Sequence, residues 1–257
     1  MKLCLSTWSL RSHIGKDFPF HEFPRVARER FGIAAVELCQ MHFPPPDSRR
    51  LDQLLKVVDE TGSRIVNVPV DVGNISQRDQ RKRAHDVRLI ESWVEVAAYV
   101  GAPVARVNTG QQDAPLDLSI AIASYNQLAD YAEPRGVKLG LENHGGISAD
   151  PRNMLALVEG VGMHRFGTLP DFGNFAPEVR YAGLAAIAPH ALVVHAKTYD
   201  LDASGNVPEF DFARCLRIVR EAGYDGYLSI EFEGNGDQYA GVQKTIELIR
   251  RVDPAVE

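Results

Sequence analysis

One complete unit of the pattern that decides the fold occupies residues 83–109, RAHDVRLIESWVEVAAYVGAPVARVNT. Apolar residues recur at helical spacing between residues 83 and 100, which predicts an amphipathic helix with one buried face. The residues on that face are Val87, Ile90, Val94, Ala97 and Ala98. Gly101 then offers the left-handed conformation that ends many helices, and the apolar run Val104–Thr109 predicts a strand.

Seven further apolar runs of strand length alternate with amphipathic stretches, so the same unit recurs along the chain. These runs are Leu3–Leu10, Ala34–Cys39, Arg64–Val70, Val137–His144, Phe166–Asp171, Ala191–Ala196 and Gly226–Phe232. Glycines again separate predicted helices from predicted strands, and a proline ends the remaining helix. These residues are Gly32, Gly62, Gly136, Gly162, Gly223 and Pro189.

Eight strands that alternate with eight helices in a chain of 257 residues predict one α/β domain, a (β/α)8 TIM barrel over residues 1–257. A doubly wound open sheet is the alternative, but such a sheet usually carries a glycine-rich phosphate loop after its first strand. The sequence Ser6-Thr7-Trp8-Ser9 at that position is no such loop, which favours the barrel.

The composition is that of an ordinary soluble protein, with 45% hydrophobic and 24% charged residues. A net charge of −6 argues against general binding to nucleic acid or to a membrane surface. No apolar run approaches the roughly 18 residues that span a bilayer, and no signal-peptide pattern is present, so we expect a cytoplasmic protein. Cys4, Cys39 and Cys215 are far apart and odd in number, which predicts reduced thiols.

Chemically useful side chains follow four consecutive predicted strands, at the end where a barrel carries its active site. They are Glu142, Asp171, His195 and Glu231. Each alone is more often a cap, a solvated loop residue or a structural histidine, but three carboxylates and an imidazole that converge would repel one another without a cation between them. Oxygen-rich ligation with one nitrogen suits Mn²⁺ or Mg²⁺ and tolerates Co²⁺ or Zn²⁺, so we expect one divalent metal ion.

Four further residues near this end of the barrel are candidates for binding a substrate. His144 shares the phase of the glutamate on the fifth strand, and Lys197 lies two residues beyond the histidine on the seventh. Asn108 and Trp8 end the fourth and first strands, where an amide can hydrogen-bond a sugar and an indole can cover its apolar face. The ordinary alternatives are a loop histidine, an exposed loop lysine, a loop-capping asparagine and a core tryptophan.

Two more charged residues share the interior phase of their strands, Glu37 on the second and Arg106 on the fourth. For this pair a structural ion pair deeper in the barrel is the expectation. Glu233 replaces Glu231 in the candidate site if the eighth strand is shifted by one pleat.

The motifs that contain these residues resemble the xylose isomerase-like barrel superfamily of sugar (phosphate) isomerases and epimerases. They are LENHGG at 141–146, PDFGN at 170–174, VVHAK at 193–197 and GYLSIEFEG at 226–234. The resemblance extends to ARVNTG at 105–110 and covers nearly the whole chain. It implies that the four candidate residues bind one divalent metal. It also implies that Glu142 and Glu231 act as an acid/base pair on opposite faces of the substrate, as in the epimerase members.

The reaction expected from this resemblance is isomerisation or epimerisation of a keto sugar or polyol-derived substrate, by proton transfer next to a carbonyl through an enediolate-like intermediate. One alternative is dehydration by the same metal site, as in members similar to inosose or dehydroshikimate dehydratase. Another is a barrel that binds a sugar without turning it over. Relatives are often dimers or tetramers, so a homo-oligomer stays open.

Four positions depart from better-known members of the superfamily. The ketose 3-epimerases carry a histidine where this chain has Asn174 and a glutamate where it has Ser148, which weighs against a free-ketohexose 3-epimerase. The related DNA-repair endonucleases use three zinc ions and extra histidines. This chain offers Asn67, Asn108 and Asn174 in those regions, so no nucleic-acid partner is expected.

Overall fold

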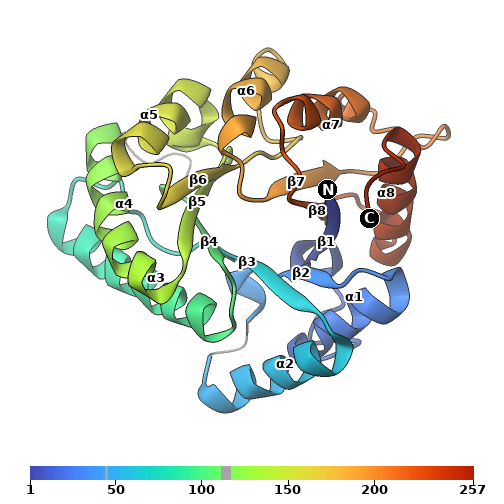
Figure 1. Cartoon of the computed structure of the whole chain (residues 1–257), viewed down its shortest axis with the longest axis horizontal. Coiled ribbons are helices and arrows are strands. Elements are labelled where there is room, and N and C mark those ends of the chain that lie inside the picture. The colour runs from blue at the N-terminus through green and yellow to red at the C-terminus, as the bar shows by residue number, and fades with distance from the viewer. Residues whose placement is uncertain (44–45, 111–116) are drawn as a thin grey trace.

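Eight short parallel strands form the centre of the protein in the computed structural model, which describes residues 1–43, 46–110 and 117–257. The strands are β1 (Lys2–Ser6), β2 (Ala35–Glu37), β3 (Arg64–Val70), β4 (Val104–Val107), β5 (Lys138–Glu142), β6 (Phe166–Leu169), β7 (Val194–Thr198) and β8 (Tyr227–Phe232). The helices form a ring outside them (Figure 1). Each strand therefore has one side toward the barrel axis and the other toward helices.

The strand order is β6-β5-β4-β3-β2-β1-β8-β7, so strands adjacent in the sequence pair from β1 to β6, β7 pairs with β8, and β8 returns to β1. Backbone hydrogen bonds also join β6 to β7: the N–H of Leu192 donates to the carbonyl of Thr168 at 2.8 Å, and that of His195 donates to Pro170 at 2.9 Å. The cylinder is therefore closed. The predicted TIM barrel is confirmed, and the alternative of an open sheet is wrong.

Eight α-helices within the described ranges cover the barrel. They are α1 (Phe23–Phe31), α2 (Ser48–Thr61), α3 (Gln80–Tyr99), α4 (Leu118–Ala132), α5 (Pro151–Val161), α6 (Arg180–Ile187), α7 (Phe212–Glu221) and α8 (Gln238–Val252). Short 3₁₀ helices accompany them: η1 (Thr7–Leu10), η2 (Phe20–Glu22), η3 (Gln40–His42), η4 (Glu133–Arg135), η5 (Gly146–Ala149) and η6 (Ala188–His190).

The ends of the helices follow local sequence rules. Six helices start after an aspartate whose side chain accepts a hydrogen bond from a backbone N–H of the first turn. The six predicted glycine stops all have positive φ, from 61° to 97°, which a side chain would strain. Helix α6 ends at Ile187, just before Pro189, as predicted.

The apolar core lies mainly between the sheet and the helices. Inside the barrel, the described residues form only a small apolar cluster, beyond which the side chains are polar. Cys4, Ala35 and Val66 form a separate apolar cluster with Tyr227 packed against it. Nearer the carboxyl ends of the strands, the buried side chains are largely charged or polar. The three cysteines are buried and free, as expected. In the described part of the chain, no helix is both long and apolar enough to cross a membrane.

Candidate metal centre and catalytic pocket

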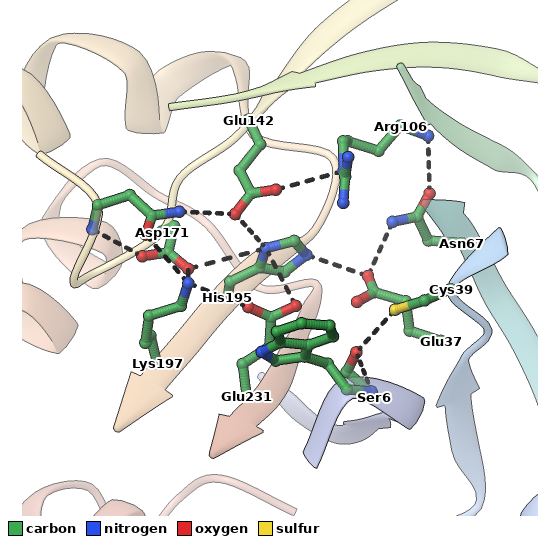
Figure 2. A network of polar contacts seen from close by, with 12 residues as sticks. Ser6, Glu37, Cys39, Asn67, Arg106, Glu142, Asp171, His195, Lys197 and Glu231 are labelled. Carbon is green, nitrogen blue, oxygen red and sulfur yellow. Dashed lines mark hydrogen bonds and ion pairs between the residues drawn. The ribbon is translucent and has the colours of Figure 1, made fainter. Parts of the chain in front are cut away.

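The four residues predicted as ligands come together at the carboxyl end of the barrel. Glu142 is the last residue of β5, His195 is the second of β7, Glu231 lies near the end of β8, and Asp171 follows β6 by two residues. One ligand atom from each lies within 4.8 Å of the others, and no member is more than 5% exposed. Figure 2 shows the imidazole of His195 at the centre, with the three carboxylates around one side of it.

The ring of His195 turns one nitrogen toward the carboxylates and the other away from them. Its Nδ1 lies 3.2 Å from Glu142 Oε1, 3.8 Å from Glu231 Oε1 and 4.0 Å from Asp171 Oδ2. Its Nε2 lies 3.1 Å from Oε2 of Glu37 on β2 (Figure 2). A hydrogen bond from Nε2 to Glu37 presents Nδ1 as the nitrogen that can hold a metal.

Two atoms at this centre are buried without satisfying hydrogen-bond geometry to any residue in the described ranges. They are Nδ1 of His195 and Oδ2 of Asp171, which both face the shared point between the ligands. Because buried polar atoms are normally paired, these two are suited to coordinating an ion. Three carboxylates and one imidazole fit a hard or borderline divalent cation, so the residues present match the predicted site.

The local electrostatics also favour a cation. Burial raises the pKa of the Asp171 carboxyl, and it raises the pKa of Glu231 to about 8. Burial opposes a charge on His195, but the carboxylates of Glu37, Glu231 and Glu142 hold its pKa well above the ordinary value. Positive charge is therefore stabilised at the centre of this cluster.

Lys197 on β7 lies inside the site rather than on an exposed loop, so that alternative is wrong. It is 2% exposed, and its Nζ lies 3.0 Å from Glu233 Oε1, 3.3 Å from Asp171 Oδ2 and 3.5 Å from Glu231 Oε2. Its ammonium also donates to Oδ1 of Asn174 at 3.0 Å. A buried lysine held in this way keeps its proton and supplies a fixed donor beside the candidate ligands.

The predicted interior pair of Glu37 with Arg106 is wrong, although both residues are buried in the barrel. Asn67 of β3 lies between them: it donates to Glu37 Oε2 at 2.7 Å and accepts from the backbone N–H of Arg106 at 3.0 Å. Arg106 instead pairs with Asp71 beyond β3, and its Nε lies 3.2 Å from Glu142 Oε2. The intervening strand thus gives each charge a different partner.

A pocket of about 190 Å³ opens onto this centre. Its lining comprises Trp8, Cys39, Met41, Asp71, Arg106, Glu142, His144, Lys197, Glu231 and Glu233. Of the four predicted substrate residues, His144, Lys197 and Trp8 are part of it. Asn108 is set one side chain back, where its amide donates to Asp71 Oδ1 at 3.0 Å. Substrate binding by these residues stays a prediction.

Trp8 and Glu233 form one wall of the pocket together. The indole Nε1 donates to Glu233 Oε1 at 2.6 Å, and the same carboxylate oxygen lies 3.0 Å from Lys197 Nζ. Glu231 and Glu233 are therefore both present, the first in the ligand cluster and the second beside it. The shift of β8 by one pleat, held as the fallback, is not needed.

Residues that sequence reasoning did not assign to the site hold its members in place. Asn174 donates through Nδ2 to Glu142 Oε1 at 2.9 Å and links that glutamate to Lys197. Asp171 Oδ1 accepts from the N–H groups of Gly173 and Asn174 at 2.7 and 2.9 Å, which leaves Oδ2 to face the centre. A Cβ on Gly173 would lie 2.9 Å from Lys197 Cδ, so this close approach requires glycine. The PDFGN motif at 170–174 was the feature of the sequence that could have indicated the roles of Gly173 and Asn174.

A family model described as xylose isomerase-like TIM barrel matches residues 25–252. Over 65 residues the chain is 42% identical to the C-glycoside deglycosidase alpha subunit of Arthrobacter globiformis, a match that covers 25% of this chain and 18% of that protein. Over 91 residues it is 34% identical to the 3'-dehydrocarminate deglycosidase alpha subunit of a Microbacterium species, covering 34% and 25% of the two chains. These two matched segments thus cover a quarter or less of the length of the curated relatives.

Solved structures of similar fold include sugar epimerases. An L-ribulose 3-epimerase matches with a TM-score of 0.80 and 17% identity, over 98% of this chain and 94% of that one. A 3-keto-D-glucoside 4-epimerase of E. coli matches at 0.76 and 17%, over 98% and 99%. The IolI protein with a bound zinc atom matches at 0.78 and 16%, over 98% of each chain. At these identities the likeness shows the fold.

Proposed function

The chain belongs to the xylose isomerase-like TIM barrel family, and we propose that it is a divalent-metal-dependent enzyme that transfers a proton next to the carbonyl of a keto sugar. The observation that carries this proposal is the buried cluster of four candidate ligand residues, in which Nδ1 of His195 and Oδ2 of Asp171 make no hydrogen bond to any described residue. The sugar epimerases among its structural neighbours support the same class of reaction.

Glu142, Asp171, His195 and Glu231 would hold the ion. When bound there, a divalent cation supplies a Lewis acid for the substrate carbonyl. Lys197, whose Nζ lies between three carboxylates, would donate a hydrogen bond to a substrate oxygen. His144 would do the same from the exposed side of the pocket.

The two glutamates provide the proton transfer. Glu142 and Glu231 reach the centre from β5 and β8, and both face Nδ1 of His195 (Figure 2). One carboxylate takes the proton from the carbon beside the carbonyl, and the electron pair of that C–H bond moves toward the carbonyl oxygen. The other glutamate returns a proton to the opposite face, which inverts the carbon and gives epimerisation.

Elimination is the second candidate, and the 42% identity to a C-glycoside deglycosidase subunit favours it. It begins with the same loss of a proton, after which the bond to a substituent β to the carbonyl breaks and the substituent leaves with the electron pair. A 3-keto glycoside suits both reactions, because its carbonyl is flanked by one carbon that can epimerise and by another that adjoins the substituted carbon. We infer that a 3-keto glycoside is the substrate class, since one structural neighbour is named a 3-keto-D-glucoside 4-epimerase and one curated relative a 3'-dehydrocarminate deglycosidase.

Exchange of substrate hydrogen for solvent deuterium tests the common first step. The metal-loaded protein is incubated in heavy water with 3-keto glucosides and free ketoses, and proton NMR follows the hydrogens next to each carbonyl. We expect exchange that EDTA abolishes and that Glu142→Gln and Glu231→Gln each reduce by about 10²–10⁴-fold, the usual contribution of a general acid or base. Full exchange in both variants would contradict the assignment.

The products separate the two candidate reactions. Epimerisation leaves the mass and substituent of the glycoside unchanged, whereas elimination releases the substituent and creates a conjugated product that absorbs in the ultraviolet. Sugar binding with neither exchange nor product would instead support a non-catalytic barrel.

A further inference from the structure

A second cavity adjoins the catalytic pocket and has a different chemical character. It measures about 470 Å³ and lies between the segment after β1, the segment after β2 and the start of α2. Its lining comprises Ile14, Gly15, Pro19, Phe20, His21, Met41, His42, Phe43, Pro46, Arg50, Leu51, Gln53 and Leu54. We name it the aromatic groove, because its lining contains two phenylalanine rings in tilted contact, with histidines and an arginine among its polar members.

The aromatic groove begins where the catalytic pocket ends. Met41 lines both spaces. Trp8 of the catalytic pocket stacks on His42 of the groove, with ring centroids 6.0 Å apart and planes 25° apart. The two spaces therefore adjoin at Met41, and a ligand at the candidate metal centre would reach the groove by extending past this side chain.

The sizes of the two spaces limit what each can take. Ligand pockets usually measure about 300–1,000 Å³, so the catalytic pocket of about 190 Å³ is small and the groove of about 470 Å³ lies inside this range. The catalytic pocket is lined mainly by charged groups, which suit the hydroxyls of one sugar ring. The groove offers Phe20 and Phe43, whose rings lie 4.3 Å apart, together with Ile14 and Leu54.

We propose that the aromatic groove binds an apolar, aromatic substituent attached to the sugar, so that the substrate is an aryl keto glycoside rather than a free sugar. This rests on the proposed function for the sugar end of the molecule. A flat ring of the substituent contacts Phe20, Phe43 and Met41, while His21, His42 and Gln53 hydrogen-bond phenolic hydroxyls. Binding energy gained in the groove then holds the sugar carbonyl at the metal centre.

Binding of two unreactive glucosides tests the groove directly. Phenyl and methyl β-D-glucopyranoside lack the carbonyl, so calorimetric titration of the Mg²⁺-loaded protein measures binding without turnover. We expect the phenyl compound to bind about tenfold tighter or better, which is the effect of burying roughly 60 Å² of apolar surface. Equal affinities, or no binding of the phenyl compound, would overturn the proposal.

Two groove variants with a matched control locate the effect. Gln53→Trp fills the groove from an exposed position on α2, and Phe43→Ala removes an aromatic wall. In each variant we expect the phenyl compound to bind no more than about threefold tighter than the methyl compound, and the affinity for the methyl compound to be unchanged. Lys56→Trp, on the same helix but outside the groove, keeps the preference. A preference that survives in both groove variants would refute this location.

The exchange experiment separates this proposal from the proposed function. The 3-keto forms of the same two glucosides are incubated in heavy water with the metal-loaded protein. Phenyl preference without exchange keeps the groove and refutes the proton transfer, whereas exchange without preference does the reverse. A concentration-dependent dimer that binds no phenyl compound would assign the groove to a second copy of the chain and overturn the proposal.

Discussion

Replacing Glu37 with alanine should weaken metal binding, although Glu37 is not one of the four candidate ligands. Its Oε2 accepts from His195 Nε2 at 3.1 Å and from Asn67 Nδ2 at 2.7 Å, and all three side chains are fully buried. Alanine would leave both donors without an acceptor in the barrel interior. The imidazole would then lose the contact that directs Nδ1 toward the three carboxylates.

The structure sets the size of the effect and predicts a partial rescue. Loss of a partner of this kind costs about 10–100-fold in metal affinity, or roughly 1.4–2.8 kcal/mol. Glutamine behaves differently because both donors converge on Oε2, while Oε1 of Glu37 makes no hydrogen bond within the described part of the chain. The amide oxygen of Glu37→Gln can take the place of Oε2 and accept both hydrogen bonds, so we expect the metal affinity of this variant to fall by less than about tenfold.

Competition with a fluorescent metal indicator measures this, using metal-free protein and Mn²⁺ or Zn²⁺. Circular dichroism and urea unfolding verify that each variant folds. Ser124→Ala is the control, since it removes a buried hydrogen bond of 2.7 Å to the Ile75 carbonyl without touching the site. The reasoning is refuted if folded Glu37→Ala binds metal within about threefold of the natural protein.

Three further predictions follow from the same site. Metal should stabilise the protein by about 2.7 kcal/mol at a free metal concentration 100 times the Kd. Urea unfolding with and without EDTA measures this, and an unchanged unfolding midpoint would argue against a preformed metal centre. Lys197→Met should lower the unfolding free energy of the metal-free protein by about 3–5 kcal/mol, because Asp171, Glu231 and Glu233 lose their buried counter-charge. Metal should then stabilise this variant more than it stabilises the natural protein, and equal gains in unfolding free energy would contradict this. Burial raises the pKa of the Cys39 thiol to about 12, so Cys39 in the folded protein at pH 8 should resist a thiol reagent that labels it fully in urea. Rapid labelling of Cys39 in the folded protein would disprove this protection of its thiol.

The strands and their order were predictable because short apolar runs and helix stops repeat in the sequence. Arg64–Val70 matches the predicted third strand at both ends. The seventh strand was placed early, at 191–196 rather than Val194–Thr198, because Ala191 and Leu192 are apolar but precede the ladder. Apolar character marks burial, whereas a ladder also requires a paired neighbour, and the sequence does not indicate where that pairing begins.

The ligand cluster was predictable because strand phase turns Glu142, His195 and Glu231 toward the barrel interior, and their positions along the strands place them at a similar depth. The residues that support it were not, since their roles depend on contacts across the barrel. Glu37 and Arg106 share an interior phase, and only the placement of Asn67 between them shows which partner each takes. A register irregularity between Val36 and Glu37 adds a shift that no periodicity reveals.

Two of the candidate ligands also lie where the cylinder closes. A backbone bridge joins Asp171 to His195, and the N–H of Phe172 donates to the His195 carbonyl at 3.2 Å. An ion held by both side chains would link the segment after β6 to β7 where the barrel closes, and so act as a clasp. Metal binding would therefore reduce local opening of the barrel as well as prepare the site for catalysis. The amide hydrogens of Phe172 and His195 should then exchange with solvent more slowly in the metal-loaded protein, and equal exchange would mean that the clasp does not operate.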